Sequence, residues 1–229
     1  MALDKLVDSA QLDSDLASVA NAIRTKGGTS ASLAFPQGFV DAVDDIETGG
    51  EDYLEKRLTN TLTSYSNETI TSIAAYSFSD CSRLTSLWLP KVRSVGSNFL
   101  LKSGVTKLAL PSLAMTLVSY TFIQAPLTHL DFTAQSSIAV NGLYISTLSV
   151  LVLRKQTLVT LANINALGQT KFKSGGTGGT LYVPQALIAD YRAATNWSTI
   201  LSYENNQILP IEGSVYETQY VDGHPLLTT

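Results

Sequence analysis

The chain has 229 residues, of which 45% are hydrophobic and only 15% charged, and about 50 serines and threonines take the place that charges usually fill. Low charge with ordinary apolar content argues against disorder, and the net charge of −4 argues against a uniformly basic nucleic-acid binder. One cysteine excludes an intramolecular disulfide framework, and two histidines, at positions 129 and 224, disfavour a histidine-based cluster. We therefore expect no metal, no cofactor and no nucleic-acid partner.

No apolar run approaches the ~20 residues that a membrane-spanning helix needs. The N-terminus also lacks a basic stretch followed by an apolar one, so no signal peptide is visible. The sequence therefore predicts a protein without membrane insertion that is made in a cytoplasm.

The first 50 residues are expected to form a small helical module. A helix is predicted over 11–26, where Leu16, Val19 and Ile23 recur at three- and four-residue steps on one face. A second helix is predicted to begin near Pro36, with Phe39 and Val43 in its apolar set, and a third over 51–58. Two such short helices bury little by themselves, so their apolar faces are expected to dock on something else.

From about residue 60 the sequence has a regular period. An LxxLxL pattern begins at residues 84, 105, 127 and 148, with a fainter copy at 62 and a further one that contains Leu181. A period of 21 to 22 residues with this pattern is typical of leucine-rich solenoids. The leucines would point inward and the residues between them outward, because side chains alternate along a strand. We therefore predict an α+β fold, a leucine-rich-repeat β-solenoid of about five to six rungs.

The end of the chain follows a different pattern. Glycine-rich residues 168–180 are expected to be an inserted loop, and residues 184–195 a helix that caps the solenoid. Residues 213–229 are polar and aromatic without a clear period, and are either a tail or an arm that docks on another chain. The predicted domains are thus 1–50, 51–212 and 213–229.

Residues 71–90, TSIAAYSFSDCSRLTSLWLP, resemble the BspA-type leucine-rich repeat, although Ser77 stands where that repeat usually has alanine. Later units lose the Phe and Cys positions of the pattern. Residues 182–197, YVPQALIADYRAATNW, look like the terminal cap of the same family. This resemblance implies a binding or scaffolding module, because a fold does not fix a function.

The segments 15–27, DLASVANAIRTKG, and 33–43, LAFPQGFVDAV, resemble an N-terminal module of tail and baseplate-associated proteins of phages that infect Gram-positive gut bacteria. This resemblance implies a virion component located in the tail, with other tail or baseplate proteins as partners of the helical module. A homo-oligomer is expected for such a part, with a trimer the favoured order.

The outward positions of the predicted strands are the candidate binding or interface face. Aromatic residues dominate interface energetics, so Trp88 and Tyr182 are its best anchors. Three alternatives are open: contact with a ligand, packing against this chain or another subunit, and plain surface. The full set of candidate residues is Trp88, Tyr182, Asp131, His129, Lys107 and Ser86.

No catalytic residue is predicted. Cys81 is expected to be a buried structural thiol rather than a nucleophile. The predicted function is a non-enzymatic virion component that binds a protein or a host-surface glycan. The alternatives are a bacterial surface adhesin and a tail-tip glycan hydrolase, which would need two carboxylates near each other, whereas the face offers only Asp131.

Overall fold

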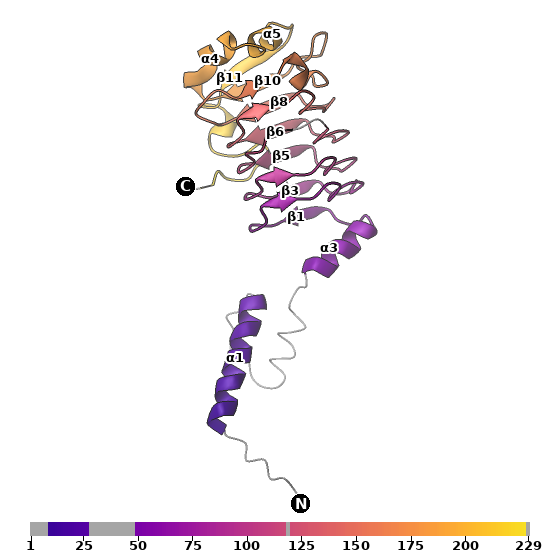
Figure 1. Ribbon diagram of the computed structural model, residues 1–229, viewed down its shortest axis with the longest axis vertical. Helices are drawn as coiled ribbons and strands as arrows, with labels where there is room; N and C mark the ends of the chain where they lie inside the picture. The colour runs from indigo at the N-terminus through magenta and orange to yellow at the C-terminus, as the bar shows by residue number, and fades with distance from the viewer. Residues whose placement is uncertain (1–8, 28–48, 118–119, 228–229) are drawn as a thin grey trace, which may run out of the picture. The chain divides into compact units, whose positions relative to one another are not determined.

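The computed structural model describes residues 9–27, 49–117 and 120–227 (Figure 1). The chain divides into two compact units, residues 1–55 and residues 56–229, each of which is treated by itself below. The division lies five residues beyond the end of the predicted helical module at residue 50.

Two of the helices predicted for the N-terminal part are confirmed. Helix α1 spans Ser9–Gly27, and helix α3 spans Gly49–Leu58. On the predicted docking face of α1, Ile23 is buried, Leu16 is half-buried and Val19 is 49% exposed. Phe39, Val43 and the predicted helix near Pro36 lie outside the described residues.

The C-terminal end of α3 belongs to the second unit. The Arg57 guanidinium donates to the Tyr76 carbonyl at 2.8 Å, and the Lys56 carbonyl accepts from the Thr61 and Leu62 amides. Across the described residues, no helix is both long enough and apolar enough to cross a membrane.

The second unit is built on parallel strands (Figure 1). The main sheet has five strands in the order β11-β10-β8-β6-β5, and three smaller sheets pair β1 with β3, β2 with β4 and β7 with β9. The strands are β1 (Ser64–Ser66), β2 (Ser72–Ile73), β3 (Ser86–Trp88), β4 (Ser94–Val95), β5 (Lys107–Leu110), β6 (His129–Phe132), β7 (Ser137–Ile138), β8 (Val150–Leu153), β9 (Thr160–Leu161), β10 (Thr180–Val183) and β11 (Gln207–Pro210).

Register in the main sheet places leucine against leucine. Leu108 pairs with Leu130, Leu130 with Leu151, and Leu151 with Leu181, and all four side chains are fully buried. The inner face of the sheet is therefore a continuous apolar row. At about 25 cal/mol for each Å² removed from water, such burial is the main force that holds the strands together.

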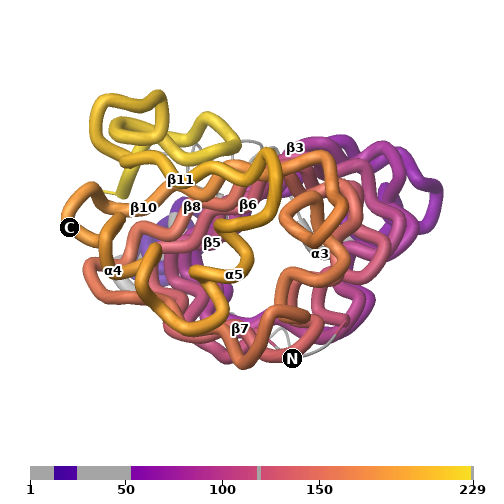
Figure 2. Tube along the Cα trace, turned by 90° about the horizontal axis from the view of Figure 1, so that it is seen from above, coloured from indigo at the N-terminus to yellow at the C-terminus, as the bar shows by residue number. Residues whose placement is uncertain are grey.

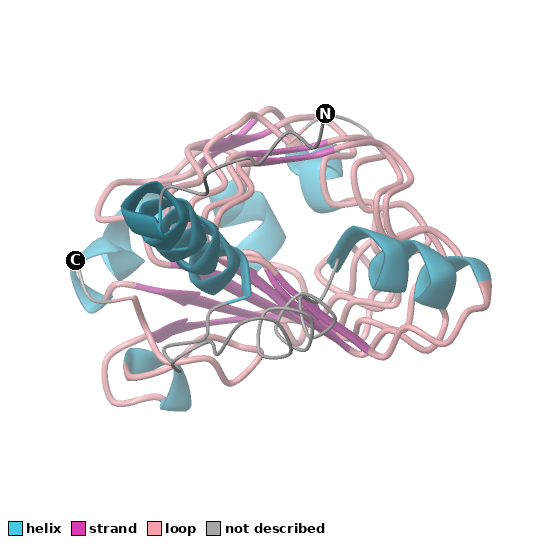
Figure 3. Ribbon diagram, turned by 90° about the horizontal axis from the view of Figure 1, so that it is seen from below, coloured by secondary structure: helices cyan, strands magenta, loops and turns pink. Residues whose placement is uncertain are grey.

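The strands are joined mostly by turns and short helices rather than by long ones, as Figure 3 shows for the loops drawn in pink. Three 3-10 helices occur in the described chain: η1 (Ile164–Leu167), η2 (Gln185–Leu187) and η3 (Val215–Glu217). Two short α-helices, α4 (Ile188–Ala193) and α5 (Trp197–Leu201), precede β11. Buried Tyr191 and Trp197 fix them, because the Tyr191 hydroxyl accepts from the Val159 amide and the Trp197 indole donates to the Val159 carbonyl.

The predicted fold class is wrong. The prediction was an α+β leucine-rich-repeat solenoid of five to six rungs, whereas the structure is a mixed α/β fold with a five-stranded parallel sheet and few helices. The leucine period specifies which side chains point inward, but not whether neighbouring backbones come close enough to pair. Strands β1 and β3 accordingly form a sheet of their own, and β11, expected only as an apolar run, is the edge strand of the main sheet.

The capping helix predicted over 184–195 corresponds to η2 and α4, which together span residues 185–193, and α5 was not predicted. Ala194 is extended, with φ −70° and ψ 139°, and Asn196 lies in the left-handed region with φ 70°, so the chain breaks between α4 and α5. Left-handed backbone ends a helix, and asparagine tolerates it better than most residues do.

A close approach of two backbone segments at Gly96 gives a testable prediction. A Cβ atom there would lie 2.2 Å from the Ala75 amide nitrogen, and the Gly96 amide itself donates to the Ile73 carbonyl. Replacing Gly96 with alanine should therefore lower the free energy of unfolding by about 1–3 kcal/mol, the usual cost of overpacking. Urea denaturation measures the change. The matched control is Ser97→Ala at the exposed neighbouring position, and an equal effect of both variants would contradict the prediction.

Candidate functional site

The candidate face consists of the outward residues of the parallel strands. Register places Ala109 beside Asp131, Asp131 beside Val152, and Val152 beside Tyr182. Three of these four side chains are completely buried although they point away from the inner core, and Trp88 on β3 is only 7% exposed. Outward residues of a sheet can be buried only if another part of the molecule covers them.

That cover is the C-terminal segment, defined here as residues 213–227. After β11 it runs back over the outer side of the strands, as the yellow trace shows in Figures 1 and 2. Two apolar clusters join it to the face: Tyr220 packs on Trp88 and Ala109, and Val221 packs with Ile211 on Val152. The candidate face is thus an intramolecular packing surface along this row.

Aromatic contacts anchor both ends of the C-terminal segment. The His224 ring stacks on Trp88 with a centroid distance of 4.1 Å and an interplanar angle of 6°, and Tyr220 lies at 5.7 Å from the same indole. At the other end, Tyr216 meets Tyr182 edge-on at 4.8 Å. Such pairs contribute about 0.5–1.5 kcal/mol each beyond the area that they bury.

A buried ion pair fixes the middle of the segment. Arg154 Nε donates to Asp131 Oδ1 at 2.8 Å, and a second guanidinium nitrogen donates to Oδ2 at 2.7 Å. The Arg154 guanidinium also donates to the Tyr216 carbonyl at 2.6 Å and to the Gln219 carbonyl at 2.8 Å, and lies over the Tyr220 ring at 5.0 Å. The Val221 amide donates to Asp131 Oδ2. The ion pair therefore holds three backbone groups of the C-terminal segment: the Tyr216 carbonyl, the Gln219 carbonyl and the Val221 amide.

The electrostatics of Asp131 follow from this burial. Removal from water raises the pKa of its carboxyl group to about 6, and the hydrogen bonds and charge of Arg154, with the Val221 amide, act in the opposite direction. Asp131 is therefore a structural carboxylate without access to a substrate.

The other outward row stays partly accessible. Ser86 and Lys107 are exposed and His129 is half-buried, with Lys107 and His129 side by side in the register. Burial, together with the charge of Lys107, lowers the pKa of His129, so the imidazole is neutral at pH 7. Ser86, Lys107 and His129 thus share one surface, but no carboxylate joins them in that row.

Residues that belong to this site were missed by the sequence analysis. Arg154 follows β8 on the same face as Val152, and Val152 pairs with Asp131, so Arg154 is a diagonal neighbour of Asp131. Opposite charges at that spacing in the sequence could have predicted the ion pair. The positions of Tyr216, Tyr220 and His224 carried no such signal, because residues 213–229 have no period that could assign them to a strand.

The remaining reactive groups do not form a second centre. Cys81 is a buried free thiol, and burial raises its pKa, which keeps it protonated, as expected for a structural cysteine. In the parts of the chain that the structure describes, no three His, Cys, Asp or Glu side chains come together as a metal site.

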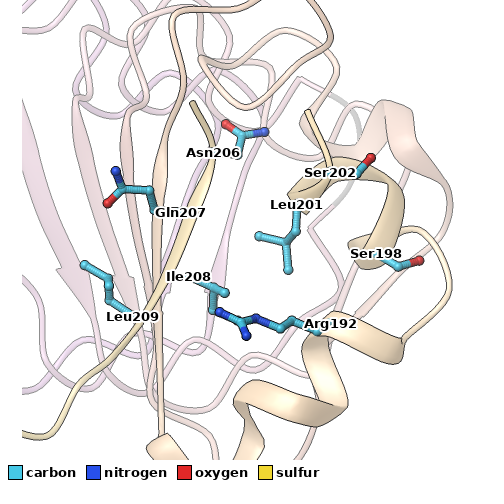
Figure 4. Close-up of a pocket in the computed structure, with 8 residues that line it drawn as sticks. All are labelled: Arg192, Ser198, Leu201, Ser202, Asn206, Gln207, Ile208 and Leu209. Atoms are coloured by element: carbon cyan, nitrogen blue, oxygen red, sulfur yellow. The ribbon is translucent and has the colours of Figure 1, made fainter. Parts of the chain in front are cut away.

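A pocket of about 510 Å³ lies between α4, α5 and β11 (Figure 4). Leu201 and Ile208 are among its apolar lining residues, and Arg192 is the one charged side chain among the described residues that line it. The set that lines it is Arg192, Ser198, Leu201, Ser202, Asn206, Gln207, Ile208 and Leu209.

No protein-family model matches the chain, and no curated protein matches it significantly.

Replacing Arg154 with methionine is expected to loosen the C-terminal segment. The variant leaves the buried Asp131 carboxyl group and the Tyr216 and Gln219 carbonyls without their hydrogen-bond donor, and loss of one partner of a buried pair costs about 3–5 kcal/mol. Chemical denaturation at pH 7, followed by Trp fluorescence, measures the loss. Arg93→Met is the matched control because Arg93 is exposed, and a loss below about 1 kcal/mol in Arg154→Met would contradict the assigned role.

The raised pKa of Asp131 predicts a defined pH dependence. Between about pH 6 and 4 the folded protein binds the Asp131 proton more tightly than the unfolded chain does, so this group stabilises the fold increasingly as the pH falls. Wild type should therefore gain unfolding free energy relative to Asp131→Asn over this window, by at most about 3 kcal/mol. Urea titrations of both proteins at intervals of one pH unit test the sign, and a difference that shrinks toward low pH would refute it.

Proposed function

We propose that this protein is a non-enzymatic component of a phage virion, of the tail, baseplate or tail-fibre type. The observation that carries the proposal is the resemblance of residues 15–27 and 33–43 to an N-terminal module of phage tail and baseplate-associated proteins. In this proposal residues 1–50 attach the chain to other tail or baseplate proteins, and the rest of the chain presents a binding surface to the host.

The two-unit organisation supports this division of roles. The parallel-strand unit has its own buried leucine core and its own covering segment. The exposed Val19 on α1 leaves an apolar position available for attachment or for a second copy. A homo-oligomer, with a trimer as the favoured order, would present several binding surfaces at once and so increase avidity.

Immunogold electron microscopy tests the virion location. Antibodies raised against the full chain should decorate the tails of phage particles in lysates of the source culture. Label confined to bacterial cell surfaces would instead support an adhesin and overturn the proposal. A second measurement addresses chemistry: incubation of the purified chain with isolated cell walls should release no soluble sugar, and release would identify a hydrolase.

A further inference from the structure

The pocket between α4, α5 and β11 lies at the edge strand of the main sheet. β11 is the last strand in the order and pairs with β10, where the Gln207 and Ile211 amides donate to the Gly179 and Val183 carbonyls. Backbone groups of a strand face its two sides alternately, so the Ile208 amide points away from β10. Among the described residues, no acceptor bonds this amide.

The same edge is a poor template for a further strand. The next amide on this side of β11 would belong to Pro210, and proline has no N–H group to donate. Ile208 therefore offers a single donor where an added strand would need a row of them. A single backbone donor suits a compact acceptor group on a small ligand better than it suits a peptide strand.

Arg192 brings a positive charge to the same place. Its side chain extends from α4 across the pocket toward Ile208, whereas the hydroxyl oxygens of Ser198 and Ser202 point away from it (Figure 4). Within the described chain Arg192 forms no ion pair, and none of the described lining residues is acidic. A guanidinium and one N–H group together match an anion that carries one charge on two oxygens, which is a carboxylate.

The space beside the guanidinium is apolar. Leu201 from α5 and Ile208 from β11 direct their side chains into it, as Figure 4 shows, and Leu201 is only half-buried, so part of its surface is open to a ligand. The volume of about 510 Å³ falls in the range of small-molecule pockets. The anionic group should therefore be attached to an aliphatic chain rather than to a second polar group.

The walls of the pocket are fixed before a ligand arrives. The Asn206 side-chain nitrogen donates to the Phe172 and Ile200 carbonyls at 2.8 and 2.7 Å, and its oxygen accepts from the Gly179 amide at 2.9 Å. These bonds join the end of α5 to the start of β11 and to the preceding layer. A preformed wall lowers the entropic cost of binding, because little has to be ordered when the ligand enters.

We propose that this pocket binds an aliphatic carboxylate. The carboxylate oxygens accept from the Arg192 guanidinium and the Ile208 amide, and the aliphatic chain lies against Leu201 and the Ile208 side chain. A free carboxylic acid and the apolar carboxyl end of a peptide share this chemistry, and the test below separates them. None of the lining residues belongs to the predicted strand face, and the inference does not rest on the proposed function.

The test is an NMR titration of the full chain with octanoate at neutral pH, followed at the Ile208 amide and the Arg192 Nε–H signal. Both signals should shift and saturate with a Kd in the millimolar range, as expected for about ten heavy atoms. From acetate through butanoate and hexanoate to octanoate, binding should tighten by up to about fourfold per methylene. Octanamide, which lacks the charge, should bind about tenfold more weakly than octanoate. N-acetyl-Gly-Leu with a free carboxylate is the peptide arm, and the tighter of the two carboxylates identifies the source.

A variant at Arg192 separates recognition of the anion from apolar adsorption. Arg192→Met should weaken octanoate binding about tenfold and leave octanamide binding within about twofold of wild type. Because Arg192 is exposed, the variant should melt at the wild-type temperature, so lost binding is not lost folding. Arg93→Met, the matched control, removes an exposed arginine elsewhere and should bind octanoate as wild type does.

Three results would overturn the inference. The first is no shift of the Ile208 amide with any carboxylate, and the second is undiminished octanoate binding in Arg192→Met. The third is a shift of the Ile208 amide that depends on protein concentration in the absence of octanoate, which would show that a second copy fills the pocket. None of these results bears on tail decoration in electron microscopy, so the proposed function can stand where this inference fails.

Discussion

Each strand of the main sheet buries its leucines only because the next strand supplies the other side of the contact. Leu108, Leu130, Leu151 and Leu181 are all completely inaccessible, and each pairs with the leucine of the neighbouring strand. The rest of the second unit depends on this in-register stacking. It determines which side chains point outward and at what spacing successive turns follow one another.

The parts of the fold that could be predicted from the sequence are those with a periodic pattern of apolar residues. Apolar spacing identified α1, and the leucine pattern identified the residues that pair in β5, β6 and β8. The fold class could not be obtained in this way. Sheet continuity depends on backbone distances between β3 and β5, and the membership of β11 in the main sheet depends on a connection through α4 and α5 that has no repeat.

The candidate site was predictable in part for the same reason. Alternation along the strands correctly indicated that Trp88 and Asp131 point away from the inner core. It could not indicate that residues 213–227 return to cover them, because this contact depends on shape complementarity between segments far apart in the sequence.

The course of the C-terminal segment also has a consequence for cooperativity. A stack of strands in which each contacts only its neighbours can fray from an open end, one layer at a time. Here the segment that leaves the last strand reaches β3 through the stacking of His224 on Trp88, after passing β6 through the Val221 amide bonded to Asp131. Opening the layer at β3 therefore disturbs residues that follow β11, and the second unit is expected to melt in a single transition. The same long-range closure slows folding, because these contacts form only after the strands between them are in place.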